Sequence, residues 1–106
     1  MMEESWSKRE EAIARRAFKK AYEAECKDLI RQIQQRANEA NDPKDIWHLY
    51  DFLTQRIKEI ERKYDYRYSM LIFVFAALMR EGWIRVGDLE GLSEDKVAKI
   101  SYLANT

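Results

Sequence analysis

The chain has 106 residues, enough for one domain with a modest core, and its 19 basic side chains balance 19 acidic ones. A general nucleic-acid binder carries a basic excess or a basic stripe, so a net charge of zero argues against nucleic acid as a partner. A membrane-spanning helix needs about 20 apolar residues. The longest apolar run, Met70 to Met79, has ten, so we expect no transmembrane segment.

The composition predicts an all-α fold, because only three glycines and one proline interrupt the chain. Strands require frequent turns, and turns depend on these residue types, whereas long helices do not. We expect one domain over residues 1–106, with a long N-terminal helix and three or four shorter helices, and with residues 1–6 disordered. The polar start lacks a signal peptide, and the single Cys26 cannot form an internal disulfide. Both features indicate the cytoplasm.

The first helix is predicted to begin after Ser7, because Ser7 and Glu10 have the spacing of a capping box. No helix-breaking residue follows until Asn41-Asp42-Pro43. Apolar side chains recur at steps of three and four along one face: Phe18, Tyr22, Cys26, Leu29, Ile33 and Ala37. The helix therefore has roughly 33 residues, or a length of about 50 Å.

This length predicts a homodimer. A compact domain of this size has a diameter of roughly 33 Å, so the first helix extends beyond its own domain. Its apolar stripe persists along most of that length, and a second copy of the chain is the simplest cover for it. We assign the dimer interface to four apolar residues of the first two helices: Leu29, Ile33, Leu53 and Ile57.

The second helix is predicted to start at Pro43, capped by Asp42, and to end at about Lys63. Its apolar stripe consists of residues close to one angle on the helical wheel: Ile46, Leu49, Leu53, Ile57, Ile60 and Tyr64. Trp47 lies about 100° from that stripe, and Asp51 follows one turn later on the same side. An aromatic side chain beside a carboxylate, away from the core face, is typical of a protein-contact surface.

Each residue of this candidate surface also has a plainer reading. Trp47 can pack under the first or third helix, and Tyr50, about 40° from the stripe, can belong to the core. Asp51 can be a surface carboxylate paired with a nearby base, and Arg56 can pair with an acid of its own helix or a charge on the first. As a group on one short helix, Trp47, Tyr50, Asp51 and Arg56 are assigned to partner binding.

The rest of the chain predicts two further helices. The third contains Met70 to Met79, is capped by Asp65 or Ser69, and ends near Gly82. The last follows Ser93 after a short turn or one-turn helix and carries a narrow apolar face. Tyr64, Tyr66 and Tyr68 mark the corner before the third helix, and their interleaved acids favour a polar helix–helix corner over a nucleic-acid stacking platform.

The sequence offers little catalytic or metal-binding chemistry. One histidine and one cysteine are too few for a zinc site built from those ligands, and no glycine-rich phosphate loop is present. His48 reads as a solvated helix-surface residue, and Cys26 reads as a small buried hydrophobe. We therefore expect a protein that is not an enzyme, with no catalytic residues, no metal and no cofactor.

The sequence resembles the fluorescence recovery protein family of cyanobacteria over nearly its whole length. The segments that carry the resemblance are Trp6-Ser7, Phe18 to Tyr22, Ile46-Trp47, Asp51-Phe52-Leu53, Lys63-Tyr64-Asp65, Ile72 to Ala76, Glu81-Gly82 and Asp95-Lys96. The resemblance implies a small helical dimer that binds the light-activated orange carotenoid protein, mainly at its C-terminal domain. It further implies detachment of that photoreceptor from the phycobilisome, near the thylakoid surface, and a faster return to the inactive orange form, which ends non-photochemical quenching.

The resemblance also assigns roles to individual residues. Trp47 and Asp51 match the functional patch of the family, whereas Tyr50 and Ile57 replace a histidine and an arginine of the family pattern. Phe73 and Lys99 match a second contact surface, although Phe73 can equally belong to the core. The alternative is a helical dimerising adaptor of the same fold that acts on a different protein partner.

Overall fold

The computed structural model describes residues 5–106 and confirms the all-α class, since no β-strand occurs in that part of the chain. Its elements are α1 (Lys8–Glu39), α2 (Pro43–Lys63), α3 (Leu71–Arg80), the 3₁₀-helix η1 (Val86–Leu89) and α4 (Glu94–Ala104). The disorder expected for residues 1–4 lies outside the described residues. Ser5 and Trp6 are described, and the Ser5 carbonyl accepts a hydrogen bond of 2.6 Å from Lys96 Nζ.

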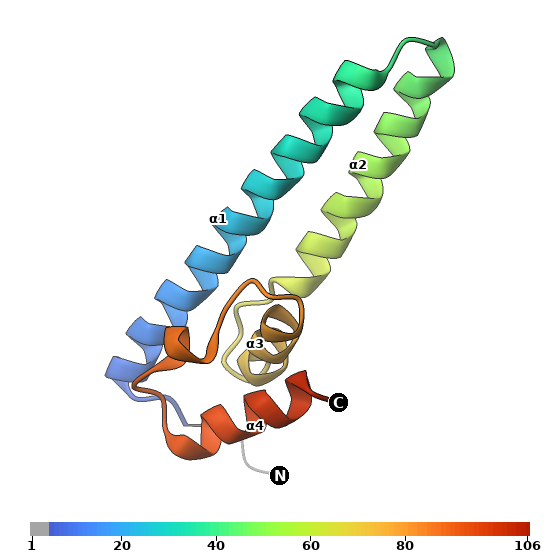
Figure 1. The fold of residues 1–106 in the computed structure, drawn as a ribbon. Helices are drawn as coiled ribbons and strands as arrows, with labels where there is room; N and C mark the ends of the chain where they lie inside the picture. Colours follow the sequence, from blue (N-terminus) through green and yellow to red (C-terminus); the bar gives the residue numbers. More distant parts are fainter. Residues whose placement is uncertain (1–4) are drawn as a thin grey trace.

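The molecule is elongated, with extents of 53 × 27 × 25 Å and a radius of gyration of 16.8 Å, against about 13 Å for a compact domain of this size. Figure 1 shows the reason: α1 and α2 form a long antiparallel hairpin, and α3, η1 and α4 gather at one end of it. We call that end the head (residues 5–21 and 64–106) and the projecting hairpin the arm (residues 22–63). The predicted overhang of the first helix is thus confirmed.

Local capping sets most helix starts. Ser7 Oγ accepts from Glu10 N at 3.1 Å, and Glu10 Oε1 accepts from Ser7 N at 3.0 Å, which completes the predicted capping box. Asp42 caps α2 with Pro43 in the first turn, and Ser93 caps α4, both as predicted. The prediction for α3 was wrong: its N-cap is Met70, with no side-chain cap, because α3 continues directly from the preceding turn.

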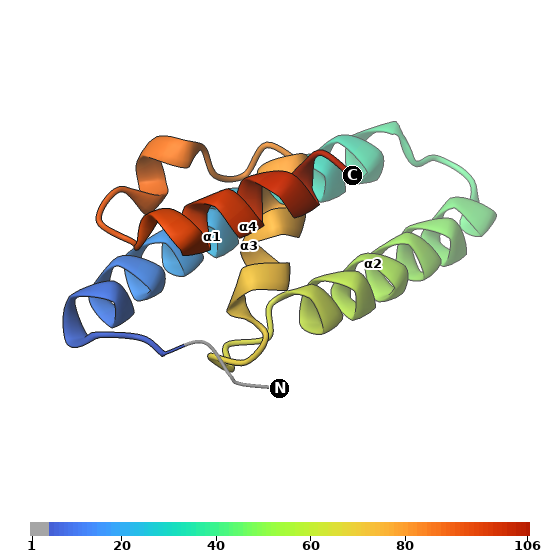
Figure 2. The same cartoon turned by 90° about the horizontal axis from the view of Figure 1, so that it is seen from below.

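The hydrophobic core lies in the head, where α4 packs on α3 and both approach the first half of α1 (Figure 2). The face of α1 that is buried in the head is centred on small alanines that flank the predicted bulky stripe, and their size permits the close approach of other helices that the sequence predicts. Ala14, Ala17 and Ala21 are at most 2% exposed, whereas Tyr22 is 45% exposed. Small side chains let the other head elements come close to the α1 backbone, so the bulkier neighbours remain at the edge of the contact.

An aromatic row joins the arm to the head. The backbone of residues 64–67 leaves the helix, and alternate side chains of an extended segment point to one side. Tyr64 and Tyr66 both meet Phe18 of α1 edge-on, at ring-centroid distances of 5.3 and 4.8 Å, and Tyr68 packs against Tyr66 and Trp6. The tyrosines do form the α2–α3 corner, but as half-buried ring contacts more than as a polar surface.

Phe18→Ala is expected to lower the free energy of unfolding by about 3 kcal/mol, because it removes the ring that joins Tyr64 to Tyr66. Urea denaturation followed by far-UV circular dichroism, at one fixed protein concentration, measures the change. Phe73→Ala is the matched control: Phe73 is 58% exposed, so its loss is expected to cost well under about 1 kcal/mol. Equal losses for the two variants would contradict the stabilising role of the aromatic row.

Candidate functional site

Large apolar side chains are exposed along α2. Trp47 is 66% exposed, Tyr50 65% and Ile46 62%, and Asp51 is exposed one turn after Trp47. The reading of Trp47 as packed under the first or third helix is therefore wrong, and so is the reading of Tyr50 as core. An aromatic and aliphatic surface of this kind on one helix is typical of a protein-contact site.

The exposure follows from how α2 is rotated about its own axis. The side chains that turn toward α1 include Leu49, Arg56 and Lys63, whereas Ile46 and Ile57 lie about a quarter turn away on the helical wheel. Ile57 is 43% exposed. Part of the stripe that the sequence predicts as the packed face of α2 is consequently left facing solvent in the single chain.

The arm half of α1 shows the same offset. Ile30 is 53% exposed, and Cys26 and Ile33 are half-buried; Cys26 is thus less buried than predicted. On the helical wheel, these residues are rotated by about a quarter turn from Glu25 and Leu29. The direction of this rotation is the same as that from Arg56 and Lys63 to Ile46 and Ile57 on α2. For two antiparallel helices, equal offsets of the same sense point to the same side of the pair. We call the combined surface the apolar face of the arm; its members are Tyr22, Cys26, Ile30, Ile33, Ile46, Tyr50, Leu53 and Ile57.

A buried carboxylate on α1 binds the C-terminal end of α2. Glu25 is 1% exposed and accepts hydrogen bonds of 2.8 Å from both Lys63 Nζ and the Tyr64 hydroxyl. Burial, followed by the hydrogen bond to the Glu25 carboxylate, raises the pKa of the Tyr64 hydroxyl, because both disfavour its phenolate form. Lys63 Nζ also donates to Glu81 at 2.6 Å, just after α3. One carboxylate thus connects α1, α2 and the head.

Arg56 belongs to this buried cluster. Its guanidinium lies 3.5 Å from Glu25 and donates to Glu59 at 2.9 Å, and its side chain is 23% exposed. Trp47 and Arg56 are nine residues apart and therefore lie about 180° apart around the helix. The structure brings Trp47, Tyr50 and Asp51 together on the exposed part of α2 and places Arg56 on the opposite side.

The other predicted contact residues differ in how much of each side chain is exposed. Leu29 is already 7% exposed within the single chain, so it has little surface left to bury against a second copy, whereas Ile33 and Leu53 are half-buried. Phe73 is 58% exposed, so its reading as a core residue is wrong. Lys99 is exposed on α4 and forms an ion pair with Asp95 at 3.3 Å.

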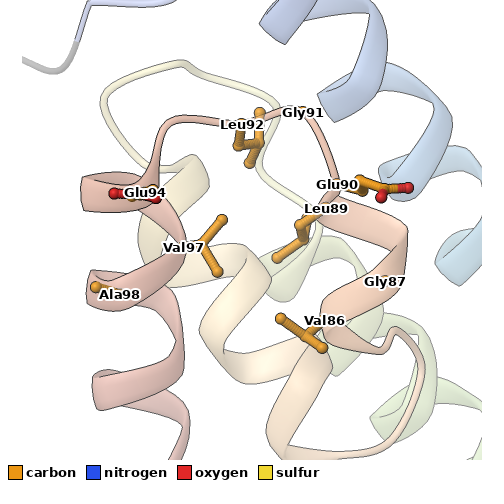
Figure 3. Close-up of a pocket in the computed structure, with 9 residues that line it drawn as sticks. All are labelled: Val86, Gly87, Leu89, Glu90, Gly91, Leu92, Glu94, Val97 and Ala98. Atoms are coloured by element: carbon orange, nitrogen blue, oxygen red, sulfur yellow. The ribbon is translucent and has the colours of Figure 1, made fainter.

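Sequence reasoning missed Glu25, although Ala17, Ala21 and Glu25 recur at steps of four and thus share one helix face. It also missed a groove of about 530 Å³ between η1 and α4. Figure 3 shows Leu89 and Val97 pointing toward one another across this groove, and its lining is mostly apolar.

Sites of other kinds are absent from the part of the chain that the structure describes. Within residues 5–106, no three His, Cys, Asp or Glu side chains are grouped as metal ligands. His48, the single histidine, is exposed on α2. No helix in the same range is long and apolar enough to cross a membrane.

Known proteins are similar to this chain in sequence and in fold. A profile of the family described as the photoprotection regulator fluorescence recovery protein matches residues 6–104. The fluorescence recovery protein of Synechocystis sp. (strain ATCC 27184 / PCC 6803 / Kazusa) is 41% identical over 102 residues, which cover 96% of this chain and 94% of that protein. The solved structure of the Fremyella diplosiphon fluorescence recovery protein matches with a TM-score of 0.93 and 44% identity, over 96% of this chain and all of that one. The Synechocystis sp PCC 6803 structure matches with a TM-score of 0.92 and 40% identity, over the same shares.

Glu25→Ala is expected to lower the free energy of unfolding by about 3 kcal/mol, because it leaves the ammonium of Lys63 and the hydroxyl of Tyr64 without their shared acceptor. Thermal and urea denaturation followed by circular dichroism measure the loss. The control is Asp28→Ala on the same helix, which removes an exposed ion pair with Arg31 and should cost less than about 1 kcal/mol. A Glu25 variant as stable as the control would contradict the role assigned to the buried carboxylate.

Proposed function

We propose, because the chain belongs to the fluorescence recovery protein family of photoprotection regulators, that it binds the light-activated orange carotenoid protein and detaches it from the phycobilisome. In this proposal it contacts mainly the C-terminal domain of the photoreceptor and accelerates its return to the inactive orange form, which ends non-photochemical quenching. The setting is the cytoplasm beside the thylakoid surface. The observation that carries the proposal is the exposed indole of Trp47 beside Asp51.

The proposed action makes and breaks no covalent bond. A partner shifts a conformational equilibrium only by its difference in affinity for the two states. Tighter binding to the conformation that leads back to the orange form therefore favours release from the antenna. To accelerate the return, the complex must also stabilise the barrier between the two forms. A scaffold that holds two separated domains of the photoreceptor close together does so by raising their effective concentration.

We also propose a homodimer in which the apolar faces of two arms cover each other. In the single chain this face leaves Ile30, Ile46 and Ile57 between 43% and 62% exposed, which is costly for aliphatic side chains in water. A twofold pairing buries the same face on both copies. Trp47 lies about 90° from the middle of the α2 part of this face, so its indole stays at the edge of the pair and remains available to a partner.

The dimer predicts that Ile57→Glu gives a folded monomer. Ile57 is 43% exposed in the single chain, so the new carboxylate is hydrated in the monomer but buried and unpaired in the dimer. Light scattering at micromolar concentration should give twice 12.7 kDa for the native chain and 12.7 kDa for the variant. Phe73→Glu, a charge at an exposed apolar position of the head, should leave the mass doubled. A native chain that is monomeric and fully helical would disprove the dimer.

The activity predicts that Trp47→Ala weakens binding to the photoreceptor by about 2 kcal/mol or more while the melting temperature changes little, because the side chain is 66% exposed. The measurement is the absorbance of the orange carotenoid protein in the dark after actinic light, with and without this protein. Tyr102→Ala is the matched control, since Tyr102 is an aromatic residue on α4 that is 70% exposed. Equal recovery rates with and without several-fold excess of the native protein would favour an adaptor for a different partner.

A further inference from the structure

The surface around Trp47 continues along the outer side of α2. Five exposed residues lie within about 60° of one another on the helical wheel, and we call them the outer row: Lys44, Trp47, Asp51, Lys58 and Arg62. The row begins in the first turn of α2 and reaches its last turn. It lies on the opposite side of the helix from Arg56 and Lys63, the two basic residues that bind Glu25.

The charged side chains of the outer row form no ion pair within the described part of the chain. None of the charged side chains of Lys44, Asp51, Lys58 and Arg62 forms an ion pair with another residue in the range 5–106. Lys58 and Arg62 are one turn apart, and two cations at that spacing destabilise a helix. The helix dipole favours a cation only in the last turn, which contains Arg62 but not Lys58. Lys58 and Arg62 are therefore both available to carboxylates of another molecule.

We propose that the outer row recognises an acidic protein surface that carries an apolar recess for the indole of Trp47. Lys58 and Arg62 then meet carboxylates of the partner about 16 and about 22 Å from that recess, at 1.5 Å per residue along the helix. Asp51, one turn from Trp47, meets a donor group of the partner. The inference rests on the proposed function, because the outer row contains Trp47 and serves the same partner.

The pattern of the row fits a protein better than a polyanion or a lipid surface. Its three cations are interrupted by a carboxylate, and the whole chain has no net charge, whereas binding to a phosphate backbone or an anionic membrane depends on a run of cations. Trp47 is the one large apolar side chain of the row, so the row has no apolar stripe to insert into lipid. A buried aromatic anchor with charges around it is the arrangement found at protein–protein contacts.

The test is a double charge reversal, Lys58→Glu with Arg62→Glu. The matched control is Arg15→Glu with Lys19→Glu on α1: it also replaces one Arg and one Lys one turn apart, both exposed and both without an ion pair to any described residue. The rate constant for association with photoactivated orange carotenoid protein is measured by stopped flow at about 0.05 M and about 0.5 M salt. Charge pairs at a contact act mainly on this rate constant and are screened by salt.

The variant in the outer row is expected to associate at least about tenfold more slowly at low salt and to lose most of the salt dependence, whereas the control stays within about twofold of the native protein. If the native protein binds and both variants associate at its rate, the inference fails and the proposed function stands. If both variants slow equally, overall charge is the cause and the inference also fails. If the native protein does not bind the photoreceptor, the proposed function fails, and the inference with it.

Two further measurements separate recognition from structure. Circular dichroism and light scattering report whether each variant keeps its helices and its mass. Lys58→Gln with Arg62→Gln removes the charges without placing carboxylates near the C-terminal end of α2, where the helix dipole disfavours them, and it should slow association in the same direction with the fold intact. A change of mass in this neutral variant would identify the row as a contact between copies of the chain and overturn the inference.

Discussion

The carboxylate of Glu25 is the contact on which the arm depends. It is 1% exposed and takes hydrogen bonds from Lys63 and Tyr64, with Arg56 at 3.5 Å. A buried charge is tolerated only when it is paired and hydrogen-bonded, so the three partners must reach one point on α1. Arg56 and Lys63 lie on α2 and Tyr64 follows it directly, so this requirement sets the rotation of α2 about its axis.

That rotation explains why so much apolar surface faces solvent. With Arg56 and Lys63 turned inward, Ile46 and Ile57 can no longer point at α1, since they lie about a quarter turn away. Trp47 is displaced further still, to the outer side. A polar contact inside the chain thus produces an apolar face outside it, which is the reverse of the usual arrangement and is suited to assembly.

The two sides of α2 therefore have different surroundings. The inner side, with Arg56, fixes the geometry through buried charges, and the outer side carries Trp47 and Asp51 in the open. In the proposed function, substitutions on the inner side act on stability and those on the outer side act on binding. This separation suits the proposed recognition of a partner, because a rigid support keeps the entropic cost of ordering a contact surface low.

The sequence by itself determined where α1, α2 and α4 begin. Ser7, Asp42 and Ser93 mark their starts because capping depends on side chains within three residues of the helix end, and the unbroken run before Pro43 determined the overhang. Only the tertiary structure decided which side of each helix is covered. The stripe of α2 is equally apolar whether it faces α1 or water. Which of the two it faces depends on Glu25, which lies 38 residues from Lys63 and binds it. A pattern within one helix carries no information on a charge that another helix buries against it.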